Sequence, residues 1–212
     1  MITRRTLLGA AAAGAGALAL APARPAQAAD VSANDWRIDP TAIATFRVEG
    51  SSASVALRKG AVAVVLLHVA RRWHYEIAPL DTGEGGGIAG HTARRPVRAA
   101  FESNYLSGTA IALHPTAYPV GGSERLWPHH EAIVRDILVD CAGTVVWGGD
   151  LSPATASHFH LVAAPHDRAL AQVAARLDPG EHAVFTAQTA GTVADPATPD
   201  RRERARRLPR PR

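Results

Sequence analysis

The spacing of apolar residues changes along the chain and predicts which segments are helices and which are strands. Apolar residues recur every three or four positions in three segments, which predicts helices over 61–72, 128–140 and 166–177. Alternating or short continuous apolar runs predict strands over 73–80, 108–114, 144–147 and 157–162. Five glycines within residues 82–90 predict a loop. This order of elements favours an α+β domain with a small antiparallel sheet flanked by helices.

The first 28 residues have the pattern of a twin-arginine signal peptide. An arginine pair at 4–5 directly precedes an apolar stretch over 7–23, and the Ala-Gln-Ala tripeptide at 26–28 fits signal peptidase, so we expect cleavage before Ala29. The stretch is poor in strongly apolar residues and shorter than the roughly 20 that a stable membrane span needs, although a retained anchor is the alternative. We therefore expect an extracytoplasmic protein, secreted or associated with the cell wall, without a membrane span after cleavage.

Residues 29–190 have the length and composition of one domain. They contain the single cysteine of the chain, Cys141, so no internal disulfide is expected, and its place in an apolar helical pattern predicts a buried, unreactive thiol. Between residues 29 and 200 there are 13 Lys and Arg against 18 Asp and Glu, so the body of the protein is mildly acidic. Aromatic residues are few and do not alternate with basic ones, and we expect no nucleic-acid partner.

Residues 191–212 have the composition of a disordered tail. This segment is rich in Arg and Pro, and it lacks the apolar periodicity that could offset the entropy of ordering the chain. Its arginines are either simply solvated or available to anionic wall polymers, lipid headgroups or nucleic acid.

Two segments contain motifs. Residues 103–113 read S-N-Y-L-S-G-T-A-I-A-L, and residues 146–150 read V-W-G-G-D and are followed by H-F-H at 158–160. Together with R-P-V-R at 95–98, they resemble the zinc D-Ala-D-Ala carboxypeptidase and L-Ala-D-Glu endopeptidase family, whose pattern is S-x-H-x-x-G-x-A-x-D, then W-G-G-D, then an acid, two residues and H-F or H-W. The resemblance extends over 62–162. It implies a Hedgehog/DD-peptidase-like fold and a function in cutting peptidoglycan stem peptides.

The residues that carry the family's chemistry are largely replaced. In the family, the His and Asp of the first motif and the His of the second bind zinc, and the acid activates the metal-bound water. The resemblance places Tyr105, Ala112 and His158 at the metal positions and Thr155 at the position of the acid. A neutral phenol is a poor zinc ligand, alanine has no donor atom and threonine cannot accept a proton near neutral pH. Since zinc ordinarily needs three protein ligands, we expect no zinc cofactor unless the site has been rebuilt.

His114 and His160 are the candidates for such a rebuilt site, which leaves zinc possible. Each lies two residues beyond a family position, His114 after Ala112 and His160 after His158, and therefore on the same face of its own strand. If these strands are antiparallel, two residues along each shift the pair in opposite directions by about 6.6 Å apiece, at about 3.3 Å per residue. The pair would then diverge unless the strands were parallel or the histidines at 129 and 130 contributed.

Arg95 and Arg98 are the candidates for substrate contacts. An arginine near the family's cleft holds a carboxylate or a substrate carbonyl, and surface salt bridging is the alternative interpretation of both residues.

The sequence leads to three hypotheses, and whether the chain is an enzyme stays open. The first is an exported, catalytically degenerate homologue that binds peptidoglycan stem peptides. The second is an active zinc carboxypeptidase or endopeptidase with rearranged ligands. The third is a structural or interaction scaffold of the cell envelope. Metal content separates the first two, and binding to wall fragments separates the first from the third. The pattern indicates no oligomeric state.

Overall fold

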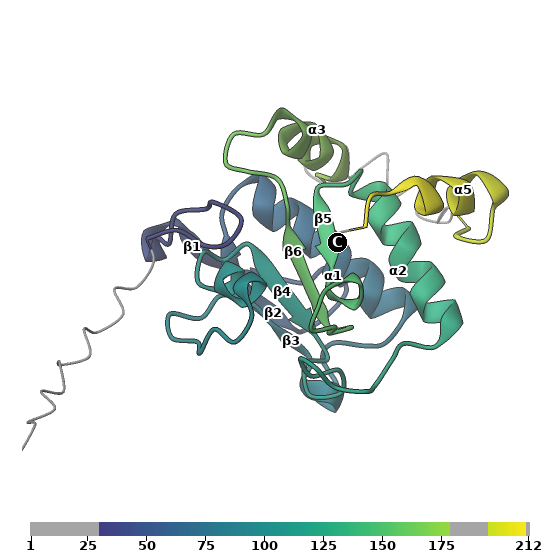
Figure 1. The fold of residues 1–212 in the computed structure, drawn as a ribbon, viewed down its shortest axis with the longest axis horizontal. Helices are drawn as coiled ribbons and strands as arrows, with labels where there is room; N and C mark the ends of the chain where they lie inside the picture. The colour runs from purple at the N-terminus through teal and green to yellow at the C-terminus, as the bar shows by residue number, and fades with distance from the viewer. Residues whose placement is uncertain (1–29, 179–194, 211–212) are drawn as a thin grey trace, which may run out of the picture.

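The computed structural model describes residues 30–178 and 195–210 (Figure 1). The predicted signal peptide, residues 1–28, lies outside these residues, as do 179–194 and 211–212. Among the helices that the structure describes, none is long and apolar enough to cross a membrane.

Four short strands form one antiparallel sheet in the order β3, β4, β6, β5. Their bounds are β3 Ile88–Ala89, β4 Ala110–Leu113, β5 Val145–Trp147 and β6 His158–Leu161. Helix α1 (Ala61–Glu76) packs against β4 and β6, and helices α2 (Pro128–Asp140) and α3 (Arg168–Leu177) pack against α1 (Figure 1). The prediction of an α+β domain with a small antiparallel sheet flanked by helices is therefore confirmed.

A two-stranded hairpin that the sequence analysis did not predict precedes this sheet. It consists of β1 (Ile43–Arg47) and β2 (Ser54–Arg58), paired antiparallel. Short 3₁₀ helices connect the other elements: η1 Pro40–Ala42, η2 Glu84–Gly86, η3 Ala100–Tyr105 and η4 Gly148–Asp150. The hairpin explains a glycine of the first motif. Gly108 has a φ of +71°, and a Cβ there would lie 2.5 Å from Ile43 Cδ1 and 2.8 Å from the Arg58 nitrogen, so only glycine lets the hairpin pack this closely.

The predicted strand over 73–80 is wrong, because α1 continues to Glu76. Trp73 is fully buried and lies one helical turn beyond Val69, on the same core-facing stripe. Arg72 and Glu76 form an ion pair at the i, i+4 spacing, which stabilises the last turn. The alternation after residue 72 therefore reflects one buried tryptophan at the end of an amphipathic helix.

The predicted disordered tail is wrong for residues 199–207, which form helix α5 (Pro199–Arg207) against α2 (Figure 1). Arg201 holds this helix in place. Its Nη2 atom donates to Asp136 Oδ2 at 2.8 Å and to Asp140 Oδ1 at 2.7 Å. Leu208 then packs against the main core. Ion pairs, more than apolar side chains, hold α5 on the domain. The sequence of α5 therefore shows no regular spacing of apolar residues.

Candidate functional site

The two faces of the sheet have different environments. Ile111, Leu113, Phe159 and Leu161 belong to the main core on the α1 side. Alternation along the strands turns Ala110, Ala112, His158 and His160 to the other face. This second face lies under η3, whose last residue, Tyr105, packs with Ala110 and Ala112 and is almost fully buried. We call this region the sheet-face site; it comprises Arg95, Glu102, Tyr105, Ala112, His158 and His160.

The sheet-face site brings together the three residues that the resemblance assigns to metal binding. Strands β4 and β6 are antiparallel, and Ala112 is the direct partner of His158. The Tyr105 hydroxyl oxygen lies 2.7 Å from His158 Nδ1. Thr155 is also close, because its carbonyl accepts from the His158 nitrogen at 3.3 Å. Its hydroxyl, however, donates to the Tyr118 carbonyl at 3.2 Å and is thus engaged with a neighbouring loop.

The histidines and Tyr105 form one chain of hydrogen bonds. His158 Nε2 lies 2.9 Å from His160 Nδ1, and the Tyr105 hydroxyl oxygen lies 3.3 Å from the Ile111 carbonyl oxygen. The single hydroxyl hydrogen of Tyr105 can be donated to that carbonyl or to His158 Nδ1, and the tautomers of the two histidines follow from that choice.

Burial keeps all three groups neutral. Burial lowers the pKa of His158 well below its usual value, and the neighbouring His160 and Arg95 add to this effect. Burial also lowers the pKa of His160 to about 4. The pKa of Tyr105 is raised by burial, against a smaller opposing effect of Arg95. At neutral pH the site therefore contains a phenol and two uncharged imidazoles.

Arg95 and Glu102 cover the tyrosine side of the site. The Arg95 guanidinium carbon lies 4.0 Å from the centre of the Tyr105 ring, and its Nη2 donates to Glu102 Oε1 at 3.1 Å. Burial would raise the pKa of Glu102, but hydrogen bonds from the Arg98 and Ala99 nitrogens and from Arg95 outweigh this and lower it. Arg98 contributes only its backbone nitrogen here, and its side chain is exposed.

The side chains at the family's metal positions do not fit zinc. Ala112 has no donor atom, the Tyr105 phenol is kept protonated, and both ring nitrogens of His158 are already in hydrogen bonds. Within residues 30–178 and 195–210, no group of three or more His, Cys, Asp or Glu could hold a metal ion.

The structure does not bring His114 and His160 together. His114 has a φ of +54°, which turns the chain away from the direction of β4 directly after Leu113. Its ring instead accepts from Trp73 Nε1 at 3.0 Å and contacts the Pro79 carbonyl at 3.1 Å, on the α1 side. His129 and His130 pack against each other at the start of α2.

The W-G-G-D segment packs against the start of β6 and the residues that precede it. Trp147 Nε1 donates to the Ala156 carbonyl at 2.8 Å, and Asp150 pairs with Arg135 of α2. A Cβ on Gly148 would lie 2.3 Å from the Thr155 carbonyl and 2.8 Å from His158 Cβ, so glycine permits the close approach that places His158. The segment therefore has a structural role in presenting His158.

Sequence reasoning missed the hydrogen bond between His158 and His160, although their i, i+2 spacing on one strand is a signal for it. It also missed the ion-pair cluster between α1, α2 and α5, which comprises His68, Arg72, Glu76, Asp136, Asp140 and Arg201. The cluster draws on three helices between residues 68 and 201, so no local pattern reveals it.

In comparisons with known proteins, the chain matches no family model, no curated protein and no solved structure.

Proposed function

We propose that the chain is an exported, catalytically degenerate relative of the zinc D-Ala-D-Ala carboxypeptidases and L-Ala-D-Glu endopeptidases, with a Hedgehog/DD-peptidase-like fold. In this proposal, the sheet-face site binds a peptidoglycan stem peptide without hydrolysing it. One observation carries the proposal: Tyr105, Ala112 and His158, the three family metal positions, meet on one face of the sheet, with the Tyr105 hydroxyl 2.7 Å from His158 Nδ1. Export rests on the twin-arginine pattern of residues 1–28.

The chemistry of the site favours binding over hydrolysis. Hydrolysis needs a group that takes a proton from water, and Thr155 at the position of the family's acid cannot do so near neutral pH. The hydrogen bond between the Tyr105 hydroxyl and His158 Nδ1 engages both groups, so neither is free to act on a substrate.

Three groups in or beside the sheet-face site suit a stem peptide. Arg95 is partly exposed, with 27% of its side chain accessible, and the side chain of Arg98 is exposed. Guanidinium groups bind carboxylates through paired hydrogen bonds, which suits the free carboxylate at the end of a stem peptide. His160 Nε2 can accept from a peptide amide or donate to a peptide carbonyl, according to its tautomer.

The proposal is tested by calorimetric titration of the purified chain with acyl-D-Ala-D-Ala and with a stem pentapeptide. We expect saturable binding of both peptides and no released D-Ala after prolonged incubation. Arg95→Gln should weaken binding about tenfold, as expected for loss of one charge-assisted contact. Arg94→Gln changes an exposed neighbouring arginine and should leave the affinity unchanged.

Absence of binding to either peptide, or an equal loss in the Arg94 and Arg95 variants, would overturn the proposal. Release of D-Ala that stops when a chelator is added would instead favour the active zinc enzyme with rearranged ligands.

A further inference from the structure

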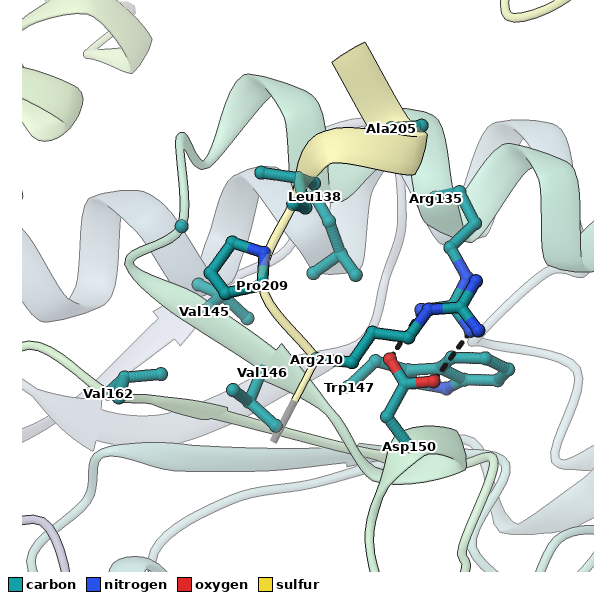
Figure 2. Close-up of a pocket in the computed structure, with 12 residues that line it drawn as sticks. Arg135, Leu138, Val145, Val146, Trp147, Asp150, Val162, Ala205, Pro209 and Arg210 are labelled. Carbon is teal, nitrogen blue, oxygen red and sulfur yellow. Dashed lines mark hydrogen bonds and ion pairs between the residues drawn. The ribbon is translucent and has the colours of Figure 1, made fainter. Parts of the chain in front are cut away.

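A cavity of about 190 Å³ lies between α2, β5, the end of α5 and the segment that follows it (Figure 2). On the domain side its wall is apolar and is formed by Leu138, Val145, Val146, Trp147 and Val162. The opposite wall is formed by Ala205, Leu208 and Pro209. None of the residues of the sheet-face site lines this cavity, so it is a separate feature of the described structure.

The cavity is accessible from solvent at an apolar mouth. Val162, which lines the cavity, is 50% exposed, so this part of the lining is open to solvent. Its size also limits the occupant. An apolar cavity of about 150 Å³ in another protein holds one benzene molecule, so a cavity of this size suits a single ring with a small substituent.

The charges on the wall indicate the chemistry of that substituent. Arg135 and Asp150 line one end and neutralise each other, with Arg135 Nη2 donating to Asp150 Oδ1 at 2.7 Å. Arg210 extends from the opposite wall toward the same end (Figure 2). In the part of the chain that the structure describes, Arg210 makes no hydrogen bond or ion pair. The wall therefore has one cation more than it has anions, which suits an anionic ligand group.

From these observations we propose that the cavity binds a small monocyclic aromatic carboxylic acid. Its ring packs against the aliphatic wall and the Trp147 indole, and its carboxylate accepts hydrogen bonds from Arg210. The ion pairs of Arg201 with Asp136 and Asp140 hold α5 on α2 and so keep the second wall in place.

Benzoate and benzyl alcohol test the charge requirement, because they share the ring and differ in the charged group. Ligand-observed NMR titration of the chain should give saturable binding of benzoate, about tenfold tighter than that of benzyl alcohol. Arg210→Gln should weaken benzoate about tenfold and leave benzyl alcohol unchanged. Arg206→Gln, which removes an exposed arginine of α5 that does not line the cavity, should change neither affinity.

A filling variant tests the location. Ala205→Leu places a larger side chain in the wall and should abolish binding of both ligands, whereas Arg204→Leu, on the exposed part of α5, should not. Thermal denaturation of each variant distinguishes filling from loss of the helix, since a filled cavity leaves the melting temperature unchanged or raises it.

The proposal is overturned if benzoate does not saturate, if Arg206→Gln weakens benzoate as much as Arg210→Gln does, or if a stable Ala205→Leu variant still binds. These outcomes are independent of stem-peptide binding at the sheet-face site.

Discussion

The sheet-face site and the ion-pair cluster both bury polar side chains, but they do so in opposite ways. In the sheet-face site, no acid among residues 30–178 and 195–210 contacts His158 or His160, and burial keeps both imidazoles uncharged. In the ion-pair cluster, burial would raise the pKa of Asp140, but His68, Arg201 and Arg72 outweigh it and lower the pKa below its usual range. The comparison shows that the partners, and not burial alone, decide whether a buried group keeps its charge.

The largest expected effect is on the ion-pair cluster. Asp136 is almost fully buried and contacts both Arg72 and Arg201, so Asp136→Asn leaves two guanidinium groups short of a counter-charge. We expect a loss of about 3–5 kcal/mol in the free energy of unfolding, measured by urea denaturation. Glu49→Gln removes an exposed ion pair with Arg71 and should cost no more than about 1 kcal/mol. Equal effects of the two substitutions would contradict the cluster's role.

The second prediction is a pH dependence that originates in the sheet-face site. The usual pKa of histidine is 6.5, and burial lowers that of His160 to about 4 in the folded chain. Between these values the unfolded chain binds a proton that the folded chain does not, so stability is full above about pH 6.5 and falls as the pH falls toward 4. His158, whose pKa is also lowered, acts in the same direction. We expect a loss on the order of 2 kcal/mol between pH 7 and pH 4.5 in urea denaturation.

The contribution of the sheet-face site to this slope can be isolated. His160→Gln should flatten the dependence on pH, whereas His166→Asn changes an exposed histidine and should preserve it. A stability that stays constant or rises on acidification would show that these imidazoles are not kept neutral.

The smallest expected effect concerns a single hydrogen bond. Tyr105→Phe removes the oxygen that His158 Nδ1 contacts at 2.7 Å and leaves this buried ring nitrogen without its hydrogen-bond partner. A cost of about 1–2 kcal/mol in the free energy of unfolding follows from this loss. Tyr75, which is 65% exposed, provides the control, because Tyr75→Phe should change stability by no more than about 0.5 kcal/mol. If both variants are equally stable, the hydrogen-bond chain does not stabilise the fold.

Much of the main sheet and its helices could be predicted from local patterns. The helix predicted over 128–140 matches α2, and the strands predicted over 108–114 and 157–162 contain β4 and β6. The end of α1 could not be predicted in this way, because a buried Trp73 on a helix mimics the alternation of a strand. Helix α5 was missed because what orders it is the contact of Arg201 with Asp136, 65 positions away.

The candidate site was predicted less completely. The resemblance grouped Tyr105, Ala112 and His158, and the pairing of β4 with β6 is compatible with that grouping. The hydroxyl of Tyr105 as partner of His158 depends on the path of η3, which no spacing rule gives. The sequence predicted that His114 shares a sheet face with Ala112, because residues two apart on a strand point the same way. That rule requires extended backbone, whereas the φ of His114 is positive.

The contact between Arg201 and α2 also has a consequence for the order in which the chain is synthesised. Asp136 and Asp140 leave the ribosome some sixty residues before Arg201. Until then, Arg72 is the only arginine that contacts these two carboxylates within the described structure, together with His68 at Asp140. In the growing domain, the carboxylates of this cluster therefore outnumber the arginines that contact them. We expect a chain that ends before residue 201 to be less stable than the full chain, because Asp136 and Asp140 then lack their ion pairs with Arg201.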